Sequence, residues 1–472
     1  MIQRLAKFFY PGFFKLNLVV VYILLGLAAT SQAGATAQPV LTLDQAVQLA
    51  LEHNQAVAIA QNKVEKAKLA EKMEKINMLP KAEITGQEGK EWATGREPQN
   101  YQVQLGQTFP TKFHLYGYGE ATALETKVWD RQYNEEAYRA SRAEVIYNTT
   151  TYYYNVVKTQ KAVAYQEAAV NNAKEAAAVA QKQLELGKIT KTSQLTAEND
   201  WAKARYELAK ARQDYLSALK QLAQQMGVSD LESIRVTSEL KVQSLSMNEY
   251  EKMKNAALIK RPEIEQGEID VTKARQTLAE AKNNSLPALN LKYLNREELN
   301  NYSLSYNLLS GDVTWATSWQ GTNLEQKSSY SSSDLFGSEK RTLSLNLTWT
   351  LDFGSTRNLV NQAELDLKNA VLTLEQTRET INLEMDQAWS AYELAIAQSE
   401  TTLQAIPLYQ KELELKQLQH RLGQATELQV KQAELNLCNA RTEVEQAQCD
   451  LATAAVKLQW VLGLLDEEGT RR

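Results

Sequence analysis

The chain has 472 residues, a formal net charge of -5 and a charged-residue content of 23%. Its acidic balance provides no general electrostatic reason to bind nucleic acid, whose phosphates attract basic proteins. Its polar average composition excludes a helical membrane protein, because each spanning helix needs about 20 mostly apolar residues. The only cysteines, Cys438 and Cys449, fall in one predicted helix, about 16 Å apart along its axis, so they cannot form a disulfide with each other there.

The first 37 residues are predicted to be a secretory signal peptide. A basic start precedes an apolar stretch at residues 16–29, and the small residues Ala35-Thr36-Ala37 fit a cleavage site. The apolar stretch is shorter than the roughly 20 residues of a spanning helix. Export is therefore expected, and an uncleaved inner-membrane anchor is the alternative.

The sequence contains a duplication. Residues 186–227 align without a gap on residues 422–463, with 13 of 42 positions identical, at an offset of 236. Ala50-Leu51 and Pro80 match Ala257-Leu258 and Pro287 at an offset of 207. This self-similarity predicts two tandem repeats of one architecture. The predicted divisions are a signal peptide at 1–37, a first repeat at 38–227, a linker at 228–245, a second repeat at 246–463 and a C-terminal tail at 464–472.

Two very long helices are predicted, at 119–186 and 355–422. Both segments are rich in Ala, Leu, Glu, Gln, Lys and Arg and nearly free of glycine. Each would run about 100 Å, and each is followed, after a Leu-Gly-x-x-Thr turn, by a helix of about 36 residues. The glycines are expected to be left-handed caps and the threonines to cap the next helix. Pro407 is expected to kink the second long helix.

Shorter helices open each repeat and are followed by strands. Thr42–Gln45 and Ser246–Glu249 fit capping boxes, and these helices run toward Pro80 and Pro287. After each proline the hydrophobic period changes to that of a strand. Residues 296–340 are rich in Asn, Ser, Gly and Trp and are interpreted as a long loop with strand extensions. The four predicted strands lie near 81–91, 100–109, 288–295 and 342–353.

The alternation in the strands favours a transmembrane β-barrel that is apolar outside and polar inside. A soluble β-sandwich is the alternative that periodicity alone leaves open. Four strands cannot close a barrel, and an open edge in lipid leaves backbone groups unsatisfied, so several copies must share one barrel. Three copies would supply twelve strands. The predicted lipid-facing residues are Tyr101, Val103, Leu105, Phe109, Leu343, Leu345, Leu347, Trp349 and Leu351.

The chain resembles the TolC family of outer-membrane efflux proteins in three features. These are the strand pairs that follow prolines, the two Leu-Gly-x-x-Thr hairpins and the repeated Ala-x-x-x-Leu/Val spacing after them. The resemblance covers essentially the whole mature chain. It implies a trimer with a twelve-stranded outer-membrane barrel and a periplasmic helical tunnel. It also implies partners, namely a periplasmic adaptor and, through it, an inner-membrane pump or a type I secretion system.

Two classes of site follow from the resemblance. The hairpin tips match the family's adaptor-contact tips; the residues are Leu186, Gly187, Thr190, Leu422, Gly423 and Thr426. The second class is a tunnel constriction, where the family's namesake carries an Asp-Val-Leu-Asp pattern. Here the positions are Gln429-Val430-Lys431-Gln432, and Glu427 is the nearest carboxylate, so the acidic ring is missing. We hypothesise that Gln429 and Gln432 narrow the tip by hydrogen bonding.

Enzyme signatures are weak. His53, His114 and His420 form no metal or nucleophile spacing, and no Walker or Gly-x-Ser-x-Gly motif is present. No cofactor is predicted.

The sequence therefore predicts a mixed α/β membrane protein: a long antiparallel α-helical coiled-coil barrel plus a transmembrane β-barrel shared by a trimer, with four strands per chain. Its predicted role is a passive exit duct through the outer membrane. The alternatives are a structural coiled coil that bridges the envelope without conducting and an exported hydrolase, and drugs, metal ions and polypeptides remain open as substrates.

Overall fold

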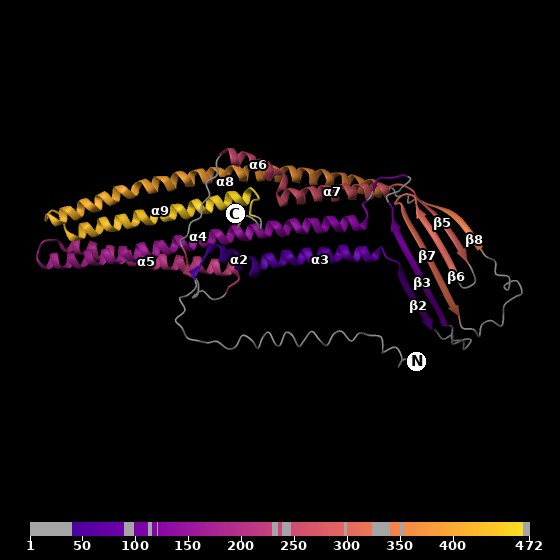
Figure 1. Ribbon diagram of the computed structural model, residues 1–472, viewed down its shortest axis with the longest axis horizontal. Coiled ribbons are helices and arrows are strands. Elements are labelled where there is room, and N and C mark those ends of the chain that lie inside the picture. Colours follow the sequence, from indigo (N-terminus) through magenta and orange to yellow (C-terminus); the bar gives the residue numbers. More distant parts are fainter. Residues whose placement is uncertain are drawn as a thin grey trace.

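The computed structural model is an elongated bundle of helices with one β-sheet at its end (Figure 1). Within the described residues, no helix combines the length and apolarity needed to cross a membrane. The predicted signal peptide lies outside these residues. The described ranges are 40–88, 99–111, 116–119, 121–228, 235–237, 247–296, 300–322, 340–349 and 354–465.

Two long helical hairpins form most of the bundle. Helix α4 (Ala123–Glu185) turns back into α5 (Lys191–Met226), and α8 (Ser355–Arg421) turns back into α9 (Glu427–Val461). The pairs lie side by side, and α4 also packs along α9 (Figure 1). Pro407 lies inside α8, which continues to Arg421, so the proline does not end the helix. The two predicted long helices are thus present with nearly the predicted bounds.

Each predicted opening helix is divided into two. Helix α2 (Leu43–His53) is separated from α3 (Gln55–Asn77) by Asn54, and α6 (Met247–Lys260) from α7 (Pro262–Asn283) by Arg261. Thr42 forms the predicted capping box with Gln45. The matching box at Ser246 falls outside the described residues.

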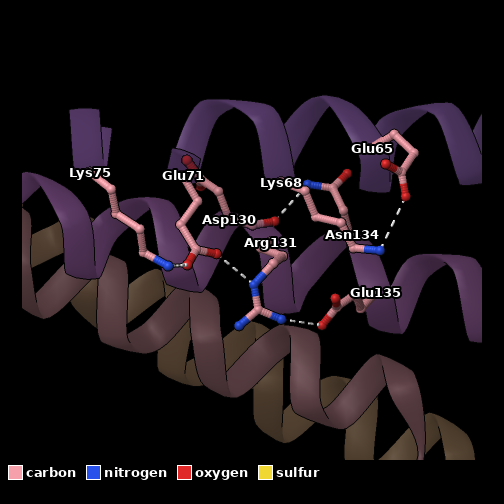
Figure 2. Close-up of polar contacts among 8 residues, drawn as sticks. All are labelled: Glu65, Lys68, Glu71, Lys75, Asp130, Arg131, Asn134 and Glu135. Carbon is pink, nitrogen blue, oxygen red and sulfur yellow. Dashed lines mark hydrogen bonds and ion pairs between the residues drawn. The ribbon is translucent and has the colours of Figure 1, made fainter. Parts of the chain in front are cut away.

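Ion pairs attach α3 to α4 beside the sheet end of the bundle. Arg131 of α4 donates to Glu71 of α3 through Nε and to Glu135 through Nη1 (Figure 2), and each of these contacts is 2.7 Å long. Lys75 also donates to Glu71, at 2.6 Å. The two donors, Lys75 first, lower the pKa of the Glu71 carboxyl. The network fixes the position of α3 along the long helix.

One antiparallel sheet carries six strands in the order β2-β3-β7-β6-β5-β8. A separate pair, β1 (Val40–Leu41) and β4 (Arg235–Val236), is parallel. The prediction of four strands per chain is therefore wrong for the described sheet. The six strands are β2 (Lys81–Glu88), β3 (Gln99–Pro110), β5 (Ala288–Arg296), β6 (Asn300–Asn307), β7 (Asp312–Thr322) and β8 (Lys340–Thr348).

The two additional strands, β6 and β7, lie in the segment 296–340, for which the sequence predicts a long loop with strand extensions and not two separate strands. Its Asn, Ser and Gly content favoured a loop, but Tyr302, Leu304 and Tyr306 alternate with polar residues as a strand requires. Pairing on both sides overrides the composition, because each strand satisfies its backbone groups against two neighbours.

The main apolar cores lie midway along the long helices. One gathers Tyr153 and Leu222 with residues of α2 and α9. Another gathers Met385 and Trp389 of α8 with Leu458 of α9 and residues of α6 and α7. The Tyr153 hydroxyl donates to the Thr237 carbonyl at 2.9 Å, which ties the β1–β4 pair to α4. The cores thus join the shorter helices to the two hairpins at mid-length.

Candidate docking tips and a two-faced sheet

The first tip is a tight turn at the end of the bundle opposite the sheet (Figure 1). Gly187 has a φ of 68°, a conformation that glycine adopts without steric cost. The Lys188 N–H donates to the Gln183 carbonyl at 2.8 Å, and the Gly187 N–H donates to the Leu184 carbonyl at 2.9 Å, which completes a Schellman cap. Thr190 then caps α5 by accepting from the Ser193 N–H at 3.2 Å.

The second tip repeats this backbone. Gly423 has a φ of 73°, and the Gln424 N–H donates to the Gln419 carbonyl at 2.8 Å. Thr426 caps α9 more fully than Thr190 caps α5, since it forms a reciprocal capping box with Gln429. The predicted left-handed glycines and threonine caps are confirmed at both tips.

Both tips present an apolar side chain to solvent. Leu186 is 68% exposed and Leu422 is 64% exposed. Neither glycine has any neighbour within 4 Å of where a Cβ would stand. The adjoining charges differ, because the first tip carries Lys188 where the second carries Gln424. Each tip therefore projects an exposed leucine, and the two tips differ in the charge of a neighbouring residue.

The predicted constriction residues already have partners inside the chain. The Gln429 side chain accepts from the Thr426 N–H at 2.9 Å. Gln432 of α9 accepts from the Asn172 amide of α4 at 3.0 Å. Glu427 lies 3.7 Å from Lys431. The three side chains therefore lie on the first turns of α9, and only Gln432 reaches the other hairpin.

Polar contacts run along the seam between α4 and α9. Lys431 pairs with Glu175, which raises the pKa of the Lys431 ammonium. Farther from the tip, Lys161 donates to Glu445 at 3.0 Å and Lys158 donates to both oxygens of Asp450 at 2.9 Å. These contacts hold the two hairpins against each other within one chain.

The sheet has one apolar and one polar face. Register places Leu291 opposite Leu345 and Tyr293 opposite Leu343, all on one face. Lys292 lies opposite Ser344 on the other face, where Thr108 and Thr314 also share a hydrogen bond of 3.0 Å. On the apolar face, Leu343 is 70% exposed and Ile84 is 76% exposed. Such exposure of large apolar side chains on one sheet face indicates an apolar environment outside the chain.

The predicted lipid-facing residues take the following positions. Val103, Leu105 and Phe109 lie in β3 and share its apolar face by alternation. Leu343, Leu345 and Leu347 lie in β8, and Trp349 follows the end of that strand. Tyr101 belongs to β3 by its backbone, although its side chain is not among those described, and Leu351 lies outside the described residues.

Sequence reasoning missed the part of this face that β6 and β7 supply. Tyr302, Leu304, Trp315 and Trp319 continue the apolar face between β3 and β5. The alternation of large apolar or aromatic residues with serine at 302–306 was the available signal.

A cavity of about 680 Å³ lies where the polar face of the sheet meets α3 and the start of α4. Its lining includes Glu74, Lys81, Glu83, Gln104, Thr108 and Asp312. Charged and amide groups at such a junction suit an aqueous passage rather than a packed core.

A sheet with one apolar and one polar face, continued by helices about 100 Å long, is typical of outer-membrane ducts. The family model for outer membrane efflux proteins matches residues 46–228 and 254–464. The chain belongs to that family. This confirms the resemblance drawn from the sequence, and with it the predicted outer-membrane location and role in efflux.

Solved structures share the fold. The CmeC outer membrane channel of Campylobacter jejuni superposes with a TM-score of 0.65 at 18% identity, over 91% of this chain and 88% of that one. The outer membrane protein VceC of Vibrio cholerae gives 0.65 at 16% identity, over 89% and 96%. The open state of the MtrE outer membrane channel of Neisseria gonorrhoeae gives 0.58 at 17% identity, over 90% of each. No curated protein sequence matches the chain at a significant level.

Proposed function

We propose that three copies of this chain form one continuous duct, which conducts solutes passively from a periplasmic adaptor and an inner-membrane pump to the cell exterior. The observation that carries the proposal is the two-faced sheet, whose end strands β2 and β8 each pair on one side only within the described residues. Unpaired strand edges are not stable in lipid, so other copies must complete the wall.

The hairpin tips are the proposed contact with the adaptor. They lie at the end of the bundle farthest from the sheet, as a periplasmic docking point requires (Figure 1). The contact residues are Leu186, Gly187, Thr190, Leu422, Gly423 and Thr426. An exposed leucine beside a bare glycine backbone gives a small apolar knob that fits a complementary groove.

Photo-crosslinking in the intact envelope tests the docking proposal. A photoreactive residue at Leu186 or Leu422 is expected to form an adduct with a periplasmic adaptor subunit. The same residue at Lys203, which is 70% exposed on α5 away from the tips, is the matched control. Equal adaptor adducts from all three positions, or none from the tips, would contradict docking through the tips.

The constriction proposal is that Gln429 and Gln432 narrow the passage at the tip. Replacing both with alanine is expected to raise single-channel conductance. Because Gln429 also caps α9, Gln429→Glu is the sharper variant, since glutamate preserves a capping box and adds a carboxylate. It is expected to increase selectivity for cations. Unchanged conductance and selectivity in both variants would place the constriction elsewhere.

The first experiment on the proposed function is the mass of the detergent-purified assembly together with its activity in planar bilayers. A trimer with discrete conductance steps is expected. A monomer or dimer without conductance would favour the alternative, a structural coiled coil that bridges the envelope without conducting.

A further inference from the structure

We infer that the β6–β7 hairpin is a pair of wall strands inserted into the barrel, so that three copies close an eighteen-stranded barrel wider than a four-strand-per-chain design. The inference rests on the proposed trimeric duct. An eighteen-stranded barrel is too wide to select solutes by size, so that selection falls to the helical tips.

The β6–β7 hairpin occupies the middle of the sheet. It lies between β3 and β5, and every neighbouring pair in the sheet is antiparallel. Removing two adjacent antiparallel strands would leave β3 beside β5 in antiparallel order. The hairpin therefore adds two strands per chain without reversing the direction of any other strand.

Both strands of the hairpin are paired along nearly their whole length. Strand β7 pairs with β3 from Asn100↔Thr322 to Pro110↔Asp312, along nearly the whole of both strands. Strand β6 pairs with β7 on one side and with β5 on the other. A plug or an external arm would not complete the ladders on both sides, so the hairpin is part of the wall.

The side chains of the hairpin alternate between the apolar and the polar face of the sheet. Tyr302 and Leu304 of β6 are 42% and 48% exposed on the apolar face, and Trp319 of β7 lies on the same face. Ser303 and Ser305 point to the polar face, where the pore would be. The hairpin thus has the same lipid and water faces as the strands that flank it.

The turn between β6 and β7 is anchored where the sheet meets the helices. Asn307 Oδ1 accepts from the Leu309 N–H at 2.9 Å, and Gly311 is buried at a φ of 78°. The Thr111 N–H, just after β3, donates to the Gly311 carbonyl at 3.3 Å. Leu309 lies against Gly117, near the start of α4, where an added Cβ would meet it at 2.6 Å. This anchoring holds the turn at the level where the sheet meets the helices.

The size consequence follows from barrel geometry. Barrel diameter grows roughly in proportion to strand number, so eighteen strands give a diameter about 1.5 times that of twelve. Barrels of 16–18 strands leave an aqueous channel. In a duct of this shape, the narrowest point lies in the helices and not in the outer membrane.

The test compares the full chain with a variant that lacks residues 300–322, both reconstituted in planar bilayers. Polyethylene glycols of graded size are added only on the barrel side, and the largest polymer that still enters and lowers the conductance is recorded. The radius limit of the full chain is expected to be about 1.5 times that of the deletion variant. Equal limits in two trimeric pores would overturn the inference while leaving the proposed duct intact. A full chain that is not trimeric, or that does not conduct, would instead overturn the proposed function.

If the deletion variant fails to assemble, a disulfide test in the full chain decides whether the hairpin lies between β3 and β5. Thr108→Cys with Thr314→Cys, in a chain whose two native cysteines are replaced by serine, is expected to form a disulfide within one chain, since these residues are register partners. The control pair is Thr108→Cys with Lys292→Cys, which lie on the same row of the sheet and would approach only if β5 were the neighbour of β3. A disulfide in the control pair and not in the first pair would overturn the inserted hairpin.

Discussion

In each half of the chain, the residue between the two opening helices bonds the C-terminal end of the second helix of the hairpin, and we call this contact the junction. The two halves form it with different side chains. In the first half Asn54, at the break between α2 and α3, donates through Nδ2 to the Gln225 carbonyl near the end of α5 at 2.9 Å. In the second half Arg261, at the break between α6 and α7, donates through Nη1 to the Val461 carbonyl at the end of α9 at 3.2 Å. Each donor satisfies a carbonyl that a helix end would leave without an intrahelical partner.

The correspondence follows the sequence offsets. Residues 54 and 261 differ by the 207 residues that separate the opening helices, and residues 225 and 461 differ by the 236 residues that separate the hairpins. The side chains differ in charge and surroundings, however. Arg261 is buried, pairs with Glu263 at 2.9 Å and lies over the ring of Trp460. What is common to both halves is therefore the hydrogen bond to the helix end, and not the residue that makes it.

Replacing Arg261 with alanine is expected to have the largest effect. It removes a buried guanidinium that bonds the Val461 carbonyl and the Glu263 carboxylate, which should cost about 3 kcal/mol. Arg261→Lys keeps the charge but not the fork of donors and is expected to lose less. The measurement is the urea concentration for half-unfolding, followed by helical circular dichroism at fixed protein concentration. A loss for Arg261→Ala no greater than for Arg261→Lys would mean that the charge retained by lysine contributes nothing to this contact.

The glycines after the two helix ends provide a matched pair. Gly227 and Gly463 both have a φ of 69°, so alanine brings the same backbone strain at either site, about 1 kcal/mol. A Cβ at Gly227 would lie 2.9 Å from the His53 carbonyl oxygen, whereas at Gly463 the nearest atom is Arg261 Cγ at 3.7 Å. Gly227→Ala is therefore expected to cost about 2 kcal/mol and Gly463→Ala about half of that. Equal urea midpoints for the two variants would show that α2 moves aside without cost.

The tips and the long helices could be predicted from the sequence because their determinants are local. Gly187 and Gly423 need only the left-handed conformation, and Thr190 and Thr426 cap the helices that begin beside them. The adaptor and constriction roles of these tips stay predictions.

The breaks in the opening helices could not be predicted because their partners are distant in sequence. Asn54 and Gln225 lie 171 residues apart, and Arg261 and Val461 lie 200 residues apart. The strands β6 and β7 were missed for a different reason. Their composition favours a loop, and only the neighbouring strands that pair with them on both sides make them part of the sheet.

The first-half junction allows its two contributions to be separated. Asn54 accepts from the Ala56 N–H at 2.8 Å, which caps α3, and also donates to Gln225. Asn54→Ala should cost about 1 kcal/mol. Asn54→Ser retains the cap and loses only the long-range bond, so its urea midpoint is expected to fall between those of the wild type and Asn54→Ala. A midpoint equal to that of the wild type would mean that the bond to α5 contributes nothing measurable.

The smallest expected difference between the two halves is in how their stability depends on acid pH. It arises at one pair of equivalent positions, Asp386 in the second half and Thr150 in the first. Asp386 of α8 accepts from Lys254 at 2.5 Å and from the Tyr250 hydroxyl at 2.9 Å, and these donors, Lys254 first, lower the pKa of its carboxyl. The residue at the same position of the first half is Thr150, whose hydroxyl donates to the Ile146 carbonyl and does not titrate in this range.

Because the pKa of Asp386 is lower in the folded state, its contribution to stability is present above the unfolded pKa of about 3.9 and is lost as the pH falls through the folded pKa. Asp386 is half exposed, so the contribution is expected to be only a few tenths of a kcal/mol. The urea midpoint of Asp386→Asn should lie slightly below that of the wild type at neutral pH. The two midpoints should converge in acid, since protonation removes the same charge. A difference that does not change with pH would show that the negative charge of Asp386 does not contribute to stability, which would make the two halves alike in their response to acid.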